Sequence, residues 1–228
     1  MRVERGFAFI DLSGFTAMTA QQGDEQAVAL LSTFRTVARE ACSRRGVRIA
    51  KWLGDGAMLV SVDSTALLAT LLEVEHSMKA AKSVLSVRCG ATFGEVILHE
   101  GDDYIGHPVN VASRLCDIAP GGEVYVSKNI AEDRPLWASA SEPFDVEIRG
   151  FVEPLEVVSL GFRSFGAKTM ACPICKIPLV PDVASSSSTD AVGSLVLFCS
   201  ESCRDTWNRR PRLSAEGQGS LRSPLMGS

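Results

Sequence analysis

The chain carries no excess of positive charge and no long apolar segment. Its 228 residues hold 23 lysines and arginines against 27 aspartates and glutamates, a formal net charge of -4. This excludes a global positive field that would draw the protein to nucleic acid or anionic lipid, so any phosphate ligand must be met by local cations and metal ions. The longest apolar runs, such as residues 66–72, fall far short of a membrane span. We expect no nucleic-acid partner and no membrane partner.

Signals for secretion and for histidine-based metal binding are also missing. Residues 1–5 are charged and lead directly into a strand-like run, without the apolar core and cleavage site of a signal peptide. We therefore expect a cytoplasmic protein. None of the three histidines has the spacing of a metal ligand, so we predict surface or loop positions for His76, His99 and His107.

The hydrophobic pattern predicts strands alternating with helices. An apolar, aromatic run over residues 6–12 predicts a buried strand, and apolar positions at helical spacing predict a helix over 24–44. Strands over 47–53 and 57–62 are joined at Gly54-Asp55-Gly56, an Asp-Gly hairpin signal. The remaining elements are a helix over 64–83, a strand region over 84–100, a helix from 107, and strands over 123–127 and 144–160. This order predicts an antiparallel-rich sheet covered by helices on one side.

Two aspartates stand where neighbouring strands end. Asp11 closes the first predicted strand, and Asp55 lies at the tip of the hairpin expected to pair beside it. Converging carboxylates that leave positions open for water and phosphate are how proteins hold Mg²⁺ on a nucleotide. The turn after Asp11, through Phe15 and Thr16, adds backbone N–H groups that could cradle phosphates. Taken singly, Asp55 fits a turn residue and Asp11 a helix cap, and spacing leaves both interpretations open.

The predicted helix from residue 107 carries a second polar group. Pro108 suits its first turn, and Asn110 and Arg114 stand four residues apart on one face. An arginine there could neutralise charge on a transferring phosphate, while the asparagine could orient a ribose oxygen. A solvated polar stripe is the alternative. Asp103 lies just before this helix and Lys51 on the first hairpin strand, and each alone is an ordinary surface charge.

Four ordered segments resemble the catalytic core of the class III adenylate and guanylate cyclases. They read FIDLSGFTAMT, KWLGDGAMLV, DYIGHPVNVASRL and IRGFVEPLEVVSL. The resemblance covers roughly residues 5–161, and an accidental match of four motifs in order is not expected. It implies an α+β fold, a ferredoxin-like βαββαβ core with extensions, which agrees with the order of elements above.

The resemblance also implies a role for each residue. Asp11 and Asp55 would bind two Mg²⁺ or Mn²⁺ ions per active site. Asn110 would orient the ribose, and Arg114 would stabilise the transition state. Arg149 stands where the family more usually has lysine. Because arginine can bind a phosphate bidentately, we expect Arg149 to contact the triphosphate.

Lys51 and Asp103 would read the purine base. Adenine offers an N6 amino donor and an N1 acceptor, which match a carboxylate and an ammonium, whereas guanine reverses that pattern. Guanylate-type members have glutamate where Lys51 stands, so ATP is the expected substrate. The implied reaction is in-line attack of the ribose 3′-hydroxyl on the α-phosphate, giving 3′,5′-cyclic AMP and pyrophosphate. The alternatives are a guanylate cyclase and a non-catalytic metal- or nucleotide-binding regulator on a cyclase fold.

The family's active sites lie between two protomers. One protomer supplies the metal-binding residues, and its partner supplies the base-reading, asparagine and arginine residues across a head-to-tail interface. This chain contains both sets. We therefore expect a homodimer with two sites and no different protein partner.

Four of the seven cysteines form a separate group near the C-terminus. Cys172 and Cys175 form a C-x₂-C pair and Cys199 and Cys203 a C-x₃-C pair, which suits a tetrahedral structural Zn²⁺ site. The segment resembles the small treble-clef-like YHS or TRASH metal modules. A sensor of copper or another soft metal is one alternative, and unligated thiols are another. The other three cysteines are expected to pack as small apolar residues: Cys42, Cys89 and Cys116.

We therefore expect three segments. These are a class III cyclase catalytic domain over residues 1–164, a four-cysteine metal module over 170–208, and a disordered tail over 209–228. Because a linker from about residue 161 intervenes, we expect few contacts between the module and the catalytic sheet. Deleting the chain after residue 164 would then leave an active dimer.

Overall fold

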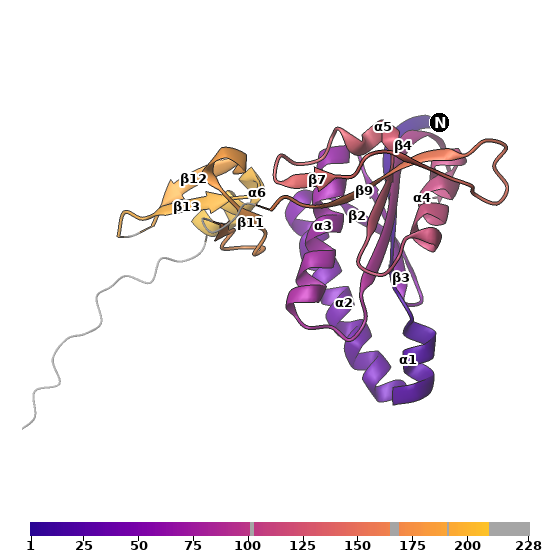
Figure 1. The fold of residues 1–228 in the computed structure, drawn as a ribbon, viewed down its shortest axis with the longest axis horizontal. Coiled ribbons are helices and arrows are strands. Elements are labelled where there is room, and N and C mark those ends of the chain that lie inside the picture. Colours follow the sequence, from indigo (N-terminus) through magenta and orange to yellow (C-terminus); the bar gives the residue numbers. More distant parts are fainter. Residues whose placement is uncertain (101–102, 165–168, 191, 210–228) are drawn as a thin grey trace, which may run out of the picture.

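The computed structural model describes residues 1–100, 103–164, 169–190 and 192–209, and Figure 1 shows its fold. The first part of the chain forms a nine-stranded sheet with helices on both faces. The strand order is β2-β3-β1-β4-β6-β9-β7, with β5 paired to β4 and β8 paired to β9. The strands are β1 (Arg2–Leu12), β2 (Arg48–Leu53), β3 (Gly56–Ser61), β4 (Val87–His99), β5 (Asp103–Ile105), β6 (Val124–Ser127), β7 (Ala138–Ala140), β8 (Phe144–Val146) and β9 (Leu155–Phe162). The helices are α1 (Phe15–Gln22), α2 (Asp24–Arg45), α3 (Ser64–Ala80), α4 (His107–Ile118) and α5 (Lys128–Ala131).

The sheet is rich in antiparallel pairs, as the hairpin signals predicted. β1 lies between β3 and β4 and pairs with both in antiparallel register. Among the described strands, β4 and β6 form the one parallel pair. The predicted hairpin is confirmed, since β2 and β3 pair across the turn and Gly54 has the positive φ of 65° that such a turn favours.

The prediction that helices cover one side of the sheet is wrong, because both faces are covered. On one face, Ala8, Ile10 and Leu12 of β1 belong to an apolar cluster that includes α2 and α3. On the other, Phe7 belongs to a cluster with Ala112 of α4. Figure 1 shows α4 on the side of the sheet opposite α2 and α3. Both alternating sets of β1 side chains are apolar, which is typical of a strand buried on two faces.

Gly90 of β4 lets α4 come very close to the sheet. A Cβ added at this glycine would lie 2.0 Å from the amide nitrogen of Cys116 and 2.4 Å from the carbonyl oxygen of Ala112. The backbone of α4 therefore rests directly on the backbone of β4.

The predicted helices and main strands are present, with shifted ends. β1 begins at Arg2 rather than at residue 6, and α3 ends at Ala80 rather than at 83. The short helix α1 was not predicted; Gly23, with a φ of 86°, separates it from α2. α5 and β7 were missed because four and three residues are too few to show a hydrophobic period. None of the helices in the described ranges combines the length and apolarity of a bilayer span.

The four-cysteine module consists of short elements. They are β10 (Met170–Ala171), β11 (Pro178–Leu179), the 3₁₀ turn η2 (Pro181–Val183), β12 (Ser186–Thr189), β13 (Leu195–Phe198) and α6 (Glu201–Asn208). β10 pairs with β11, and β12 pairs with β13. The predicted tail over 209–228 lies, from residue 210 onward, outside the described residues.

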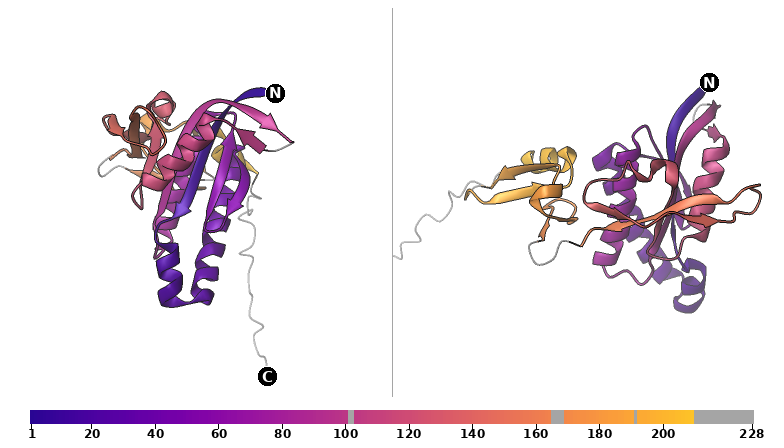
Figure 2. Two further views of the ribbon diagram at one scale, coloured as in Figure 1. Left: turned by 90° about the vertical axis from the view of Figure 1, so that its right-hand side faces the viewer. Right: turned by 45° about the horizontal axis from the view of Figure 1, so that its top comes forward.

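The module packs against the catalytic domain, although mainly through residues outside the sheet, with which few contacts were expected. The buried Trp137, just before β7, donates its indole N–H to the carbonyl of Cys199 at 3.3 Å and stacks on Phe162. His76, predicted at the surface, packs against Phe162, and its Nε2 lies 3.2 Å from the carbonyl oxygen of Lys176. The module thus lies beside α3 and β7 (Figure 1; Figure 2) and contacts helices rather than the sheet face. A linker in the sequence separates two segments along the chain but does not fix how they pack.

Candidate active site and metal centre

Asp11 and Asp55 lie at one rim of the sheet, as predicted. Asp11 is near the end of β1 and pairs in register with Gly56, the residue directly after Asp55. Backbone pairing therefore brings the two carboxylates together. Burial is the main cause that raises the pKa of Asp55, and the negative charge of Asp11 raises it further. Two carboxylates whose charges repel each other are a favourable place for a divalent cation.

Arg88 of β4 is a rim residue that the sequence interpretation missed. It is the register partner of Asp11 on the other side of β1. Its Nε and Nη2 donate to Asp11 Oδ2 at 2.8 and 2.6 Å, and its Nη1 donates to the carbonyl of Asp117 at 2.9 Å. The available signal was a charge between the apolar residues Val87 and Cys89 at the start of β4. Two carboxylates and one guanidinium thus share the rim.

Lys51 and Asp103, the predicted purine-reading pair, are in contact. Lys51 Nζ of β2 lies 2.6 Å from Asp103 Oδ1 of β5, and each side chain is about half exposed. The hydrogen bond from Lys51 lowers the pKa of Asp103. Residues 52 positions apart in the chain therefore present an ammonium and a carboxylate side by side.

Asn110, Arg114 and Arg149 line one cavity of about 320 Å³. The first two come from α4, and Arg149 comes from the segment between β8 and β9. Arg114 Nη1 also lies 3.2 Å from Asp117 Oδ2. Neither rim aspartate lines this cavity. The predicted residues therefore form three groups in a single chain: the rim, the Lys51–Asp103 pair and the α4 cavity.

Phe15 and Thr16, predicted to contact phosphates, form the first turn of α1. The helix begins at Gly14, whose φ of 86° turns the chain sharply after β1. Free N–H groups at the start of a helix favour anions. Phe15 packs against the main apolar cluster, whereas Thr16 is exposed.

The four C-terminal cysteines form a compact cluster. The Sγ atoms of Cys172, Cys175, Cys199 and Cys203 all lie within 4.8 Å of one another, and all four residues are buried. Cys199 Sγ lies 3.2 Å from Cys175 Sγ and 3.6 Å from Cys203 Sγ. Tetrahedral zinc with Zn–S bonds of about 2.3 Å needs sulfurs about 3.8 Å apart. The four residues therefore fit a tetrahedral metal ion.

Local hydrogen bonds shape both cysteine pairs. In the first, the amide of Lys176 donates to the carbonyl of Cys172 at 2.9 Å, and Lys176 takes a positive φ of 66°. In the second, Ser200 caps α6 and accepts from the amide of Cys203. The remaining cysteines, Cys42, Cys89 and Cys116, are buried, as expected of small apolar residues.

The chain belongs to the adenylate and guanylate cyclase catalytic domain family. The sequence model of that family matches residues 4–153, which hold all the rim, purine-pair and α4-cavity residues. The match ends before the four-cysteine module. The class predicted from the four motifs is thereby confirmed for the first part of the chain.

Several curated proteins are similar to this chain. An adenylate cyclase of Streptomyces coelicolor is 38% identical over 144 residues, which are 62% of this chain and 37% of that protein. An uncharacterized protein of Mycobacterium tuberculosis is 32% identical over 156 residues, which are 68% of this chain and 40% of that protein. The chain thus spans about two fifths of the length of these curated relatives.

Solved structures share the fold. The adenylyl cyclase CyaB from Pseudomonas aeruginosa superposes with a TM-score of 0.64 at 22% identity, over 72% of this chain and 96% of that one. The guanylate cyclase domain of RhGC from Catenaria anguillulae, solved with GTP, gives 0.63 at 17% identity, over 72% and 100%. The predicted α+β cyclase fold is confirmed.

Proposed function

We propose that the chain is an adenylate cyclase that converts ATP to 3′,5′-cyclic AMP and pyrophosphate. The observation that carries the choice of ATP is the Lys51–Asp103 contact at 2.6 Å. A carboxylate can accept from the adenine N6 amino group, and an ammonium can donate to N1. Guanine offers an acceptor and a donor at the corresponding positions, so the same pair would face it with mismatched groups.

The rim residues are proposed to hold the triphosphate end of the substrate. Asp11 and Asp55 would bind two Mg²⁺ or Mn²⁺ ions, which polarise the α-phosphate and lower the pKa of the attacking 3′-hydroxyl when bound. Arg88 keeps a positive charge beside Asp11, and the first turn of α1, at Phe15 and Thr16, offers backbone N–H groups to phosphate oxygens.

The α4 cavity is proposed to hold the reacting centre. Asn110 would orient the ribose, and Arg114 would neutralise charge that develops on the α-phosphate. Arg149 lines the same cavity and would contact the triphosphate, where its planar guanidinium can bind two oxygens at once. No covalent intermediate on the protein is needed.

A homodimer would bring the groups together. Because the rim aspartates do not line the α4 cavity of their own chain, we propose that the rim of one protomer faces the α4 cavity of its partner. The catalytic domain would span residues 1–164, and the four-cysteine module over 170–208 would hold a structural Zn²⁺ ion through Cys172, Cys175, Cys199 and Cys203.

A nucleotide assay tests the proposal. The purified chain is incubated with ATP or with GTP, in Mg²⁺ or in Mn²⁺, and the products are separated by chromatography. We expect cyclic AMP and pyrophosphate, at a rate well above that of cyclic GMP formation. Preferential conversion of GTP would overturn the assignment of the substrate, and no conversion of either nucleotide would favour a non-catalytic regulator.

A further inference from the structure

A buried ion-pair network lies where α2 meets α3. Glu73 of α3 is fully buried, and its carboxylate accepts from both Arg44 and Arg45 in the last turn of α2. The Arg45 side chain is only 3% exposed. Glu40 also pairs with Arg44 at 3.6 Å, so Glu73 is the carboxylate that pairs with the buried Arg45, and Arg44 shares it. A buried charge needs such partners because an uncompensated charge is costly in a protein interior.

The four-cysteine cluster supplies a second partner for Arg45. Arg45 Nη2 lies 3.4 Å from Cys199 Sγ. Four neutral thiols would carry no charge, whereas four thiolates around a divalent ion carry a net charge of about −2. The guanidinium of Arg45 therefore has an anionic second partner when the cluster holds a metal ion, and a neutral one when the cluster holds thiols.

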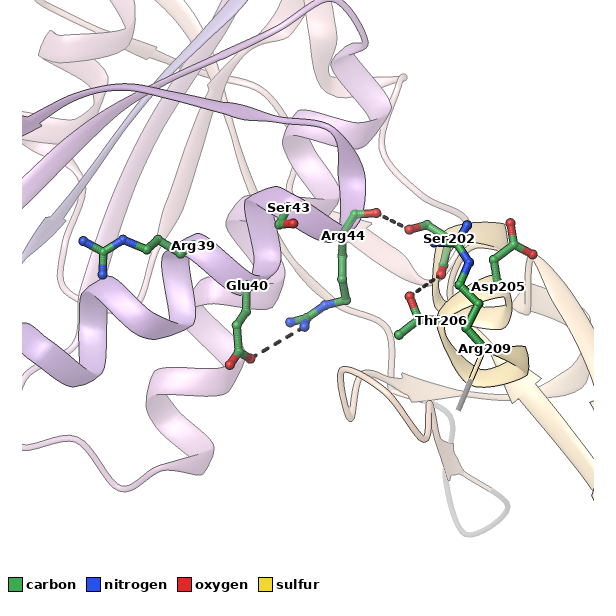
Figure 3. Close-up of a pocket in the computed structure, with 8 residues that line it drawn as sticks. All are labelled: Arg39, Glu40, Ser43, Arg44, Ser202, Asp205, Thr206 and Arg209. Carbon is green, nitrogen blue, oxygen red and sulfur yellow. Dashed lines mark hydrogen bonds and ion pairs between the residues drawn. The ribbon is translucent and has the colours of Figure 1, made fainter. Parts of the chain in front are cut away.

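Further contacts hold the module against the last turn of α2. The hydroxyl of Ser202 in α6 donates to the carbonyl of Arg44, as Figure 3 shows. Around this contact, a cavity of about 700 Å³ is lined by Arg39, Glu40, Ser43 and Arg44 of α2 and by Ser202, Asp205, Thr206 and Arg209 from the module side. The carbonyl of Cys199 accepts from Trp137 and, at 2.8 Å, from the hydroxyl of Ser185. The cluster and its docking surface therefore share Cys199.

We propose that Arg45 of the catalytic domain neutralises an anionic metal–thiolate centre, so that metal loading and docking of the module are coupled. Arg45 is a positioning residue of the metal centre that comes from outside the four-cysteine segment. Removing the metal removes the negative charge at Cys199, leaves Arg45 with the Glu73 carboxylate that Arg44 shares, and weakens the docking. The inference rests on the proposed metal site but not on cyclase activity.

Zinc release from the full-length protein tests this inference. Zinc-loaded wild type and variants are mixed with a chromogenic chelator, and the rate of zinc transfer is followed by absorbance. We expect Arg45→Gln to release zinc roughly 10–100-fold faster than wild type, as is usual when a partner of a metal ligand is lost. Arg44→Gln is the matched control, because Arg44 shares Glu73 but does not contact a cysteine sulfur. It should release zinc within about twofold of the wild-type rate.

Glu73→Gln separates neutralisation from ordinary packing. It removes the carboxylate that competes for Arg45 and keeps the size of the side chain, so we expect zinc release at the wild-type rate or slower. A purely structural network predicts the same fast release as in Arg45→Gln. The double variant Arg45→Gln/Glu73→Gln leaves no buried ion pair at this place and should fold, as circular dichroism would report, yet still release zinc quickly.

The outcomes of these measurements decide on the role of Arg45 and on the metal site. Equal release from wild type and Arg45→Gln, or equally fast release from Arg44→Gln and Arg45→Gln, would overturn the role of Arg45. A wild-type protein that binds no zinc in metal analysis would overturn the metal site together with this inference. A wild type with one zinc per chain and equal release rates overturns the inference alone, and neither result bears on the cyclase proposal.

Discussion

Candidate metal ligands gather at two places in this chain, the aspartate rim and the four-cysteine cluster, and the two are built in opposite ways. At the rim, Asp11 and Asp55 stay partly exposed, and Arg88 occupies one oxygen of Asp11. In the module, all four cysteines are buried, and the guanidinium beside Cys199 is buried as well. An open site can exchange its ligands, whereas a closed one retains them. This difference agrees with the proposed roles, which are turnover at the rim and retention of a metal ion in the module.

The largest expected effect comes from removing a rim carboxylate. Asp11→Ala or Asp55→Ala should each lower the rate of cyclic AMP formation by roughly 100-fold or more, because the site can no longer hold the metal that polarises the phosphate. Zinc content, measured by metal analysis, should stay at the wild-type value, because the module is a separate site. Near wild-type turnover in either variant would refute the metal assignment.

Mixing two inactive variants tests whether each active site is shared between two protomers. Asp11→Ala and Arg114→Ala should both be inactive alone, since each homodimer lacks half of every site. Random mixing should restore about a quarter of wild-type activity, because half of the dimers are mixed and each has one intact site. If heterodimers form, as native mass spectrometry would report, and activity does not return, the shared site is wrong.

The next effect concerns the purine pair. Lys51→Gln should lower kcat/KM for ATP by roughly 10–100-fold, because one charge-assisted hydrogen bond to the base is lost. The preference for ATP over GTP should shrink with it. Thermal stability should hardly change, since an exposed ion pair contributes little. An unchanged nucleotide preference would show that Lys51 does not bind the base.

Truncation of the module should cost stability, contrary to the expectation from the linker. A chain ending at residue 164 loses the cover over Trp137, whose indole is only 1% exposed. Uncovering a large aromatic side chain costs about 3 kcal/mol, which lowers the Tm of a domain of this size by roughly 6–12 °C. Differential scanning calorimetry measures it. A truncated protein as stable as the full chain would mean that the docking surface is not closed in solution.

Replacing Asp55 by asparagine should have the smallest effect, a small change in melting temperature whose direction is informative. Burial raises the pKa of Asp55, so above that pKa the folded protein carries a carboxylate whose charge costs stability. In buffer without Mg²⁺ or Mn²⁺, Asp55→Asn should therefore melt slightly above wild type near neutral pH. The difference should vanish at acid pH, where the carboxyl is protonated in both the folded and unfolded states.

Asp11→Asn is the matched comparison, and it should melt below wild type because Arg88 loses its carboxylate partner. The same melting temperatures for both asparagine variants would mean that the two carboxylates do not differ in environment.

The rim was predictable because each aspartate follows a strong local signal. Asp11 lies near the end of a buried strand, and Asp55 sits in an Asp-Gly turn, so adjacent strands place them at one edge. Arg88 was not predictable in the same way, because its contact depends on the register of β4 against β1. A charged residue between apolar ones at the start of a strand shows that a partner is needed but not which one.

The docking of the module was harder still to predict. Spacing alone predicted the four ligands, because cysteine pairs are rare and specific. The surface that receives the module consists of isolated residues from different elements, including His76, Trp137 and Arg45. Such residues share no period along the chain, so a one-dimensional pattern does not reveal that they meet. The position of α4 on the sheet face opposite α2 and α3 could have been predicted, because both faces of β1 are apolar.

Gly90 sets the position of α4 in a way that side chains do not. Backbone rests on backbone where α4 crosses β4, so the distance between Arg88 and the helix bearing Asn110 and Arg114 is a dimension of the main chain. Rotamer changes in the surrounding core leave that dimension unaltered. A single methyl group at residue 90 would push α4 as a whole away from β4 and would displace the side chains of Asn110 and Arg114 together.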